Sequence, residues 1–378
     1  MTRVLVAMSG GVDSSVAAAL LRQQGCEVVG ATMKLWGGPS DSGCCSVADV
    51  EDARRVCQQL GIAHHVFNFT TEFERDVVAP YVGAHASGLT PNPCISCNAH
   101  MKFDRFLARA LQLGFDAVAT GHHARVTRGA AGWELRRGRD RAKDQSYVLY
   151  MLGQSELAHL LLPVGEMTKE AVRSLAAALG LRTAAKPDSQ DVCFISRQGG
   201  REAFIGARTP LHPGRLLGTG GEELGEVAAL ELVTVGQRRR LGQSAHSLPE
   251  RRYVVDVDLD LGTATLGRLD DLLVREVLVE GVRWARGPAP SGDRAEVQLS
   301  AHGQPLAATW YSRAGRGALG EGGRSTGCVV LDAPARRVAP GQAVVLYGPA
   351  PESDVVLGGG TAAVAAPRLE PDQRLPDA

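Results

Sequence analysis

The chain has 378 residues, of which 44% are hydrophobic and 22% charged. These proportions are typical of a globular protein, and the length suggests about two or three domains. Forty-one basic residues balance 41 acidic ones, so no overall positive field indicates a nucleic-acid partner and any RNA contact must come from local patches. With no leader-like start and no apolar run of about 18 residues, we expect a cytoplasmic protein without a membrane partner.

Residues 3–15, RVLVAMSGGVDSS, predict a buried strand, a Ser/Gly turn and a helix that starts near Asp13. We expect Asp13, Ser14 and Ser15 to cap the first turn of that helix. Backbone N–H groups, hydroxyls and a positive helix end together form a phosphate site. An ordinary strand–turn–helix is the alternative. The nucleotide site is favoured because the pattern directly follows an apolar strand.

Short apolar strands alternate with amphipathic helices over the next hundred residues. The predicted strands are 3–8, 27–33, 64–69 and 116–119, and the predicted helices are 12–24, 47–60, 71–82 and 98–113. This alternation predicts an α/β fold with a parallel sheet covered on both faces. Ligands bind beyond the carboxyl ends of such strands, so SGGVDSS, MKLWGG and TGHHAR should line one crevice.

In the second half of the chain, the alternation of strands and helices gives way to mostly short strands and loops. Two further helices are predicted at Gln145–Met151 and Thr168–Leu179, before a catalytic domain over 1–200 ends. A small mixed domain over 201–272 follows, with strands at Leu232–Val235, Tyr253–Val257 and Thr265–Leu266. Short β-runs at regular spacing predict an antiparallel β-barrel over 273–361. Residues 362–378 are expected to form a disordered tail.

The eight cysteines favour reduced, reactive or metal-binding thiols over a structural framework. Cys94 and Cys97 precede a helix, whose N-terminus lowers a thiol pKa, so Cys97 is a candidate nucleophile. Half of a zinc site with Cys44 and Cys45, a redox pair and inert thiols are the alternatives, and we predict no metal site. Cys193 alone would be a core thiol, but it follows a polar cluster at 188–191.

Several motifs occur in one order along nearly the whole chain: SGGVDSS, VVGATMKLW, CCSVADVEDARRVCQQLGI, TPNPCISCNAHMKF, ATGHHAR, KDQSYVLYML, SQDVCFI and TVGQRRRLG. The first resembles the PP-loop of the ATP pyrophosphatases. Together they resemble the tRNA-specific 2-thiouridylase family, which replaces oxygen by sulfur at carbon 2 of the wobble uridine. Argininosuccinate synthase-like or glutamine-dependent PP-loop enzymes, and a non-catalytic RNA-binding protein, are the alternative functions.

The resemblance implies that ATP adenylates carbon 2 and that sulfur then comes from a persulfide on Cys193, which Cys97 resolves to leave a Cys97–Cys193 disulfide. It implies Mg²⁺ bridging the phosphates near Asp13, and a sulfur donor such as a cysteine desulfurase or a relay carrier. The residues implied in ATP binding are Ala7, Met8, Ser9, Gly10, Gly11, Val12, Asp13, Ser14, Met33 and Gly121.

The same resemblance implies contacts with the tRNA anticodon loop. The implied residues are Asn92, Pro93, Cys94 and His122 around the base, with Lys143, Asp144, Gln145, Trp310, Tyr311 and Gln342. A basic run containing Arg136 and Arg137, and a second one at 238–240, are further expected RNA contacts. The chain departs from the family pattern at Cys94, where many members have Asp, and at Trp310, where a basic residue is common.

Overall fold

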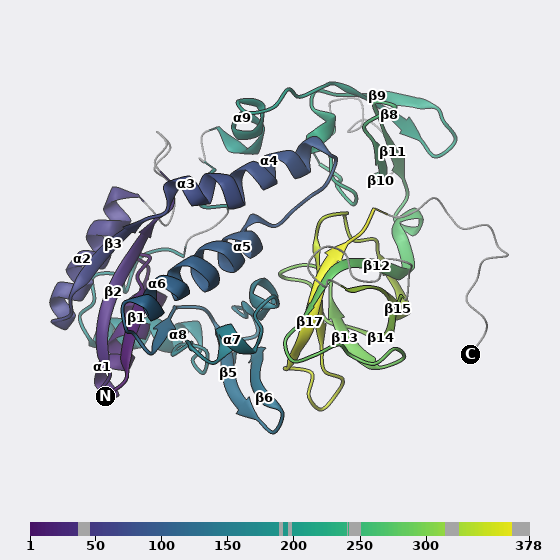
Figure 1. The fold of residues 1–378 in the computed structure, drawn as a ribbon. Coiled ribbons are helices and arrows are strands. Elements are labelled where there is room, and N and C mark those ends of the chain that lie inside the picture. Colours follow the sequence, from purple (N-terminus) through teal and green to yellow (C-terminus); the bar gives the residue numbers. More distant parts are fainter. Residues whose placement is uncertain are drawn as a thin grey trace.

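The computed structural model describes residues 1–36, 46–188, 192–195, 199–239, 241, 251–313 and 325–364. An α/β region, a small β-sheet region and a β-barrel follow one another along the chain and lie at three corners of the molecule (Figure 1). Among the described residues, no helix combines the length and apolarity needed to cross a bilayer.

The α/β region is built on a five-stranded sheet with the strand order β3-β2-β1-β4-β7. All neighbouring strands pair in parallel, as predicted. The strands are β1 (Arg3–Ala7), β2 (Glu27–Lys34), β3 (His64–Asn68), β4 (Ala117–Ala119) and β7 (Leu160–Leu161). The last of these, with two residues, was not predicted.

Helices cover both faces of the sheet because side chains alternate along β1. Val4 and Val6 pack into one hydrophobic core, and Leu5 and Ala7 into another. The first core lies under α1 (Val12–Gln23), α2 (Val47–Leu60) and α8 (Lys169–Ala178). The second lies under two long helical rods (Figure 1).

Each of these rods contains a π-helical stretch. One rod runs through α3 (Thr70–Phe73), η1 (Glu74–Val78) and α4 (Ala79–Ala86), and the other through α5 (Pro93–Ser96), η2 (Cys97–Phe106) and α6 (Leu107–Gln112). Both rods extend beyond the predicted helices 71–82 and 98–113. Cys97 is the first residue of the second π-helical stretch, and such stretches often mark functional sites.

Between the sheet and the barrel lie β5 (Ala124–Gly129), β6 (Gly132–Arg137), η3 (Ser146–Leu149) and α7 (Gln154–Leu157), whereas α9 (Gly200–Gly206) lies beside α3 and α4 (Figure 1). The hairpin β5–β6 is antiparallel. The helix predicted over Gln145–Met151 is only the 3₁₀ turn η3. Its residues Ser146, Tyr147 and Leu149 are buried, so they serve as core and not as one face of a helix.

The small region is a four-stranded sheet with the order β10-β11-β8-β9 and its own apolar core. Its strands are β8 (Gly214–Gly218), β9 (Glu223–Val227), β10 (Tyr253–Asp258) and β11 (Thr263–Gly267). The strand predicted over Leu232–Val235 is wrong. Its first residue ends the 3₁₀ turn η4 (Leu230–Leu232), and Leu230 and Val233 pack into this core.

After the turn η5 (Asp270–Leu272), six strands form a closed antiparallel barrel in the order β12-β15-β14-β13-β16-β17. They are β12 (Leu273–Trp284), β13 (Arg294–Gln298), β14 (Leu306–Ser312), β15 (Ser325–Arg336), β16 (Ala343–Tyr347) and β17 (Val356–Ala362). The predicted barrel is therefore confirmed. Its last strand ends at Ala362, inside the expected tail, and residues 365–378 lie outside the described part.

Candidate nucleotide and thiol site

Two glycines allow three chain segments to meet at the carboxyl end of β1. Gly10 has a φ of +71°, and a Cβ there would overlap the backbone carbonyl of Asp49 at the start of α2. Gly121, after β4, would place a Cβ 2.6 Å from the backbone nitrogen of Ser14. Any larger residue would push the turn away from its neighbours. The close approach of the turn after β1, the start of α2 and the loop after β4 therefore depends on both glycines.

The Ser14 and Ser15 hydroxyls do not cap α1, contrary to the prediction. Gly11 is the N-cap of α1, and no side chain caps it. Ser14 and Ser15 lie within the helix and donate to the carbonyl of Gly11, at 3.2 and 2.7 Å. The backbone N–H of Ser9 donates to the Ser14 hydroxyl at 3.2 Å. The cap predicted from Asp13, Ser14 and Ser15 is wrong because the helix already begins at Val12, and these hydroxyls fix the shape of the turn instead.

Asp13 faces a buried histidine and a lysine. Its carboxylate accepts hydrogen bonds from His123 Nε2 at 3.0 Å and from Lys169 Nζ at 2.7 Å. Burial raises the pKa of Asp13, but the hydrogen bonds from His123 and Lys169 outweigh burial, so the pKa lies below its usual value. The carboxylate is thus charged at neutral pH. Sequence reasoning missed both partners because they come from distant segments.

A second acid, Asp188, is surrounded by cations. Its carboxylate contacts Lys143 Nζ at 2.9 Å, Lys169 Nζ at 2.9 Å and Arg173 Nη2 at 2.7 Å. Nearby, Lys186 donates to the carbonyl of Gly10 at 2.9 Å and pairs with Asp49 and Asp52. Basic side chains therefore surround the turn between β1 and α1. Among the described residues, no group of three or more His, Cys, Asp or Glu is arranged to hold a metal ion; Cys44 and Cys45 lie outside these residues.

The two thiol segments pack against the same hydrophobic core. Cys97 and Cys193 are both half-buried at the edge of the core under the two rods. Phe194, next to Cys193, is buried edge-on against Tyr81, with ring centroids 5.7 Å apart. Burial raises the pKa of Tyr81. The Cys193 segment therefore adjoins the first rod at Tyr81, and α5, which carries Cys94, packs against the same rod.

Ahead of Cys97, Asn92 caps α5. Its side-chain carbonyl accepts the backbone N–H of Cys94 at 3.0 Å. Pro93 is buried in the first turn, and Cys94 is exposed. This cap fixes the end of the helical rod that carries Cys94 and Cys97. It leaves the Cys94 side chain on the surface.

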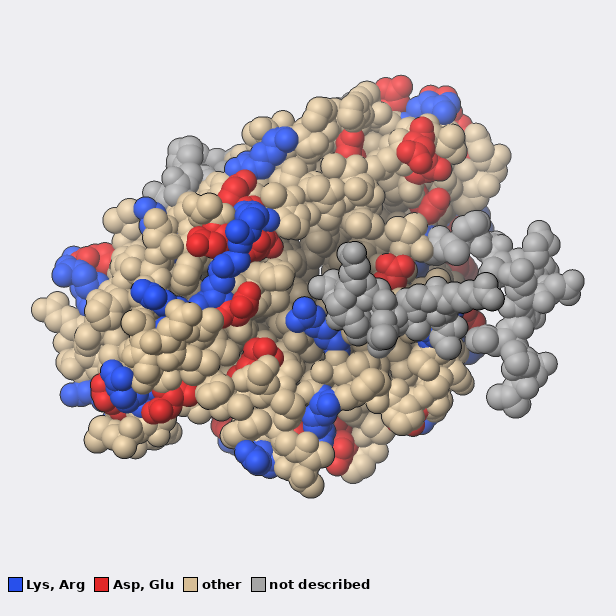
Figure 2. Space-filling view, in the orientation of Figure 1, with Lys and Arg blue, Asp and Glu red and all other residues tan. Residues whose placement is uncertain are grey.

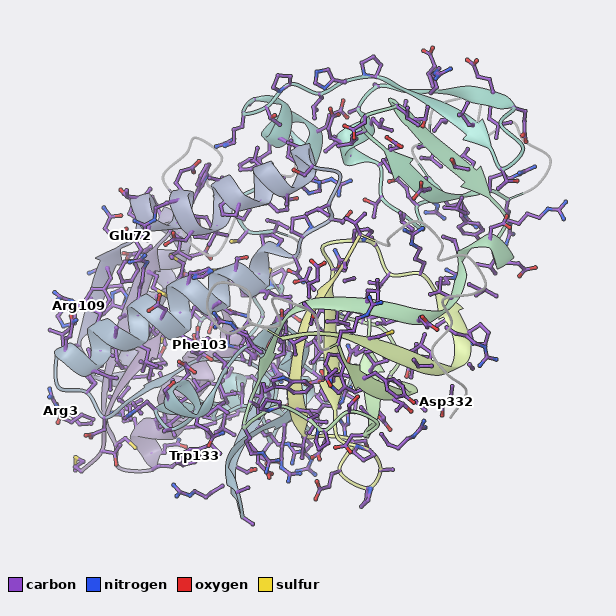
Figure 3. The ribbon with its side chains drawn as sticks, turned by 45° about the vertical axis from the view of Figure 1, so that its right-hand side comes forward. Arg3, Glu72, Phe103, Arg109, Trp133 and Asp332 are labelled. Carbon is purple, nitrogen blue, oxygen red and sulfur yellow. The ribbon has the colours of Figure 1, made fainter. Side chains whose placement is uncertain are left out.

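His122 is buried beside the nucleotide turn. Its Nδ1 lies 2.7 Å from the Thr120 hydroxyl, and its Nε2 lies 3.4 Å from Lys102 Nζ. Burial, followed by the charge of Lys102, holds the pKa of His122 well below its usual value, so the ring is neutral at pH 7. The ring of Phe103 lies 6.0 Å from it, on the inner helical rod (Figure 3).

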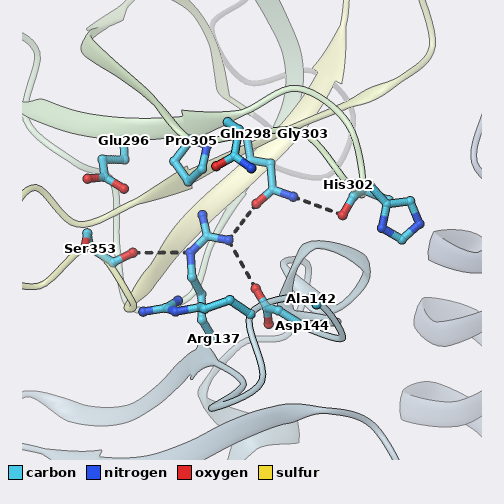
Figure 4. Close-up of a pocket in the computed structure, with 12 residues that line it drawn as sticks. Arg137, Ala142, Asp144, Glu296, Gln298, His302, Gly303, Pro305 and Ser353 are labelled. Atoms are coloured by element: carbon cyan, nitrogen blue, oxygen red, sulfur yellow. Dashed lines mark hydrogen bonds and ion pairs between the residues drawn. The ribbon is translucent and has the colours of Figure 1, made fainter. Parts of the chain in front are cut away.

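The basic run at 136–143 is used largely inside the protein. The Arg137 guanidinium lies 3.5 Å from the centre of the Tyr347 ring and contacts Gln298 at 2.6 Å and Asp144 at 3.1 Å. Figure 4 shows the contacts of Arg137 with Gln298 and Asp144 beside a cavity of about 330 Å³ between the α/β region and the barrel. Arg136 pairs with Glu134 and Asp354. Arg137 is buried and fastens the barrel to the hairpin, so it has little surface for RNA, whereas contact of RNA with the partly exposed Arg136 stays a prediction.

Two family models match the chain. The tRNA methyl transferase HUP domain matches residues 2–197, and the Aminomethyltransferase beta-barrel domain matches residues 274–362. A tRNA-specific 2-thiouridylase MnmA of Corynebacterium efficiens is 44% identical over 368 residues, which cover 95% of this chain and 98% of the relative. The relative of the same name in Chloroflexus aggregans is 45% identical, with coverages of 95% and 98%. The chain belongs to the tRNA-specific 2-thiouridylase family.

Solved structures resemble the chain only partly. A 4-thiouridine synthetase in complex with RNA and ATP has a TM-score of 0.36 and 18% identity, and the match covers 51% of this chain and 45% of that one. A likeness at this level adds nothing to the assignment. The family prediction and the fold-class prediction are confirmed by the relatives, the family models and the barrel.

The residues implied as tRNA contacts of the thiouridylase family differ in their surroundings. Lys143 pairs with Asp188, and Gln145 accepts the backbone N–H of His123 at 2.9 Å. Asp144 is turned inward, where it accepts from Gly138, Ser146 and Arg137. It shapes the loop that presents Lys143. Figure 2 shows basic and acidic side chains interspersed over the face in view.

Trp310 is a core residue of the barrel. It is 1% exposed and packs edge-on against Trp284, with ring centroids 5.2 Å apart. Because side chains alternate along β14, Tyr311 faces outward and is 36% exposed. Trp310 therefore has no surface for RNA, and we remove it from the expected contacts. The substitution of a basic residue by tryptophan changes what fills the barrel.

Gln342 joins the barrel to the segment ahead of Cys97. Its side-chain amide donates to the carbonyl of Thr90, and the N–H of Thr90 donates to the carbonyl of Pro340 at 2.8 Å. Gly341 lies against Thr90, where its φ of +88° favours glycine and a Cβ would lie 3.0 Å from the Thr90 backbone nitrogen. The barrel thus contacts the chain two residues before Asn92.

Proposed function

We propose that this ATP-dependent tRNA-uridine sulfurtransferase uses the crevice at the carboxyl end of β1 to adenylate carbon 2 of the wobble uridine. That carbon is a urea-like carbonyl, so its oxygen is a poor leaving group until AMP is attached. Two observations support the proposal: Gly10 and Gly121 allow the turn after β1 to pack against α2 and the loop after β4, and Cys97 and Cys193 pack against the same hydrophobic core.

ATP is proposed to bind along residues 7–14, with its phosphates on the turn and the N-terminus of α1. Met33, 9% exposed near the end of β2, would offer its main chain to the adenine, and Gly121 would border the nucleotide. Mg²⁺ commonly binds through one carboxylate and substrate phosphates. Asp13, charged and partly exposed, fits that single position. Bound there, Mg²⁺ would neutralise phosphate charge.

The sulfur step is proposed to use two thiols. The terminal sulfur of a Cys193 persulfide attacks carbon 2, and AMP leaves with the oxygen. The Cys97 thiolate then attacks Cys193 Sγ, which breaks the S–S bond to the transferred sulfur. The products are 2-thiouridine and a Cys97–Cys193 disulfide, which a cellular thiol must reduce before the next turnover. A desulfurase or a relay carrier would supply the persulfide.

The tRNA is proposed to lie across the α/β region and the barrel. The base would be extruded from the anticodon stack and lie near Asn92, Pro93, Cys94 and His122. The outward-facing Tyr311 and the exposed Arg238 and Arg239 remain candidates for phosphate contacts. The separate apolar cores of the small sheet and of the barrel support the proposed boundary near residue 272. We place the activity in the cytoplasm, where reducing conditions keep thiols usable.

The test is a reconstituted reaction. The protein is incubated with ATP, Mg²⁺, a sulfide source and unmodified tRNA, and nucleosides are analysed by mass spectrometry while pyrophosphate is measured. We expect oxygen-to-sulfur exchange at the wobble uridine, matched by pyrophosphate release. Pyrophosphate release that survives thiol alkylation, without thiouridine, would favour another PP-loop enzyme. RNA binding without pyrophosphate would favour a non-catalytic protein.

A further inference from the structure

Three cations from separate segments meet at one carboxylate. Lys143 precedes η3, Lys169 begins α8, Arg173 lies one turn later, and all three contact Asp188 within 2.9 Å. Burial raises the pKa of Asp188, but the hydrogen bonds from Lys143 and Lys169 outweigh it and hold the pKa well below its usual range. The carboxylate is therefore charged, and it neutralises only part of this cationic cluster.

The cationic cluster adjoins the proposed phosphate turn. Lys169 contacts both Asp188 and Asp13, which lies in the first turn of α1. Lys186, two residues before Asp188, reaches the carbonyl of Gly10. Lys143, Lys169 and Arg173 thus lie with Asp188 and Asp13, and with Asp140 close to Lys143, at the place where the turn and the helix end favour an anion.

The residues of the cluster are not those expected for ATP from the sequence. Lys169 and Arg173 belong to no predicted site, and Lys143 was expected to contact tRNA. Lys169 is 7% and Arg173 32% exposed at their side chains, whereas Lys143 is 44% exposed. Lys169 is therefore the most enclosed member of the cluster, and Lys143 is the most accessible one.

We propose that Lys143, Lys169 and Arg173 form the binding site for the pyrophosphate end of ATP, and that the Asp188 carboxylate occupies this site until the phosphates displace it. The inference rests on the proposed nucleotide function. A pyrophosphate group carries more charge and more acceptor oxygens than one carboxylate, so the cations gain by the exchange. Weakly charged anions do not, so Asp188 makes the site selective for polyphosphate.

The two sides of this arrangement predict opposite effects on affinity. Asp188→Asn removes the competing charge and keeps the shape, so ATP and inorganic pyrophosphate should bind about three- to tenfold more tightly, because less of the protein is in a form that excludes them. Lys143→Met removes the exposed ammonium group that we propose as a phosphate partner. ATP and pyrophosphate should therefore both bind roughly tenfold more weakly.

The experiment is isothermal titration calorimetry on the full chain with ATP and with pyrophosphate, each with Mg²⁺ and with EDTA. Asp332→Asn is the matched control, because Asp332 also pairs with an arginine but lies on the outer side of the barrel (Figure 3). It should change neither affinity. Circular dichroism confirms that each variant is folded.

Three results would overturn the inference. The first is an unchanged affinity of Asp188→Asn for ATP and pyrophosphate, and the second is an affinity of Asp188→Asn that is weaker with Mg²⁺ but not with EDTA. The third is an unchanged affinity of Lys143→Met. The second result would make Asp188 a metal ligand and not a competitor. Failure of the wild-type protein to bind ATP would instead refute the proposed function. The two failures are therefore distinguishable.

Discussion

Gly121 offers a direct test of the crevice. In Gly121→Ala the new Cβ would lie 2.6 Å from the Ser14 nitrogen and 2.7 Å from the Asp13 carbonyl carbon, and both are backbone atoms. To reach the 3.4 Å of an ordinary contact, the first turn of α1 must move by about 0.8 Å. Overpacking of this kind costs about 1–3 kcal/mol of unfolding free energy.

The displacement falls on the proposed phosphate donors. A shift of about 1 Å at a reacting group can lower a rate about 100-fold, so we expect a loss of this order in the thiolation rate of Gly121→Ala. Urea unfolding measures the stability, and thiouridine formation under single-turnover conditions measures the rate. The wild-type protein, assayed in parallel, gives the reference for both.

Gly83→Ala is the matched control. Gly83 lies within α4, and a Cβ there would meet no atom within 4 Å. Alanine in a helix interior is favoured over glycine by about 0.5–1 kcal/mol, so this variant should be as stable as the wild type or more so, with its rate unchanged. If Gly121→Ala behaved like Gly83→Ala, the close packing of α1 on the loop after β4 would not position the nucleotide.

Three further predictions concern other parts of the molecule. Burial lowers the pKa of His85 to about 4, so the folded state stays neutral where the unfolded chain takes up a proton. The contribution of His85 to the free energy of unfolding should therefore be fully present above about pH 6.5. It should fall by up to about 1.4 kcal/mol per pH unit towards pH 4, measured by urea unfolding. Cys97→Ser and Cys193→Ser should each abolish thiolation while tRNA binding, measured by filter retention, survives. Arg137→Met leaves Asp144 buried without its cation and should cost about 3–5 kcal/mol of unfolding free energy.

Each prediction has a control in the same chain. His85→Gln should reduce the acid dependence without removing the part that comes from His122, whose pKa is also lowered by burial, whereas His100→Gln, at an exposed position, should leave it unchanged. Cys26→Ser should keep full thiolation, and continued thiolation in the Cys193 variant would end its assignment as the persulfide carrier. Arg139→Met, at an exposed position, should stay within about 0.5 kcal/mol of wild type. An equal loss in both arginine variants would show that Arg137 has no special role.

Local patterns in the sequence are sufficient to predict much of the fold. The helix predicted at 47–60 has the observed bounds, and β1 and β2 differ by one residue from the predicted strands. β7 was missed because two residues show no periodicity. β17 contains Gly358, Gly359 and Gly360, which lower strand propensity, and its pairing in the closed barrel is what makes it a strand.

The site residues, like the strands, could be predicted where the signal is local in the sequence and not where it depends on distant partners. The glycine turn and the cysteines were found because each motif is contiguous in the sequence. His123 and Lys169 were missed because their roles depend on Asp13, which lies 110 and 156 residues away. Arg137 was misread for the same reason. A charge run looks alike whether its partners are phosphates or the Asp144 and Asp354 of its own protein.

The bond from Gln342 to Thr90 has a mechanical consequence. A displacement of the barrel would reach Cys97 through only the eight residues from Thr90 to Cys97. The barrel side of this connection is the turn at 340–342, where Gly341 has a φ of +88° and lies close against Thr90. Insertions and deletions should therefore be tolerated less in this turn than in any other described barrel loop, even though it touches neither nucleotide nor thiol.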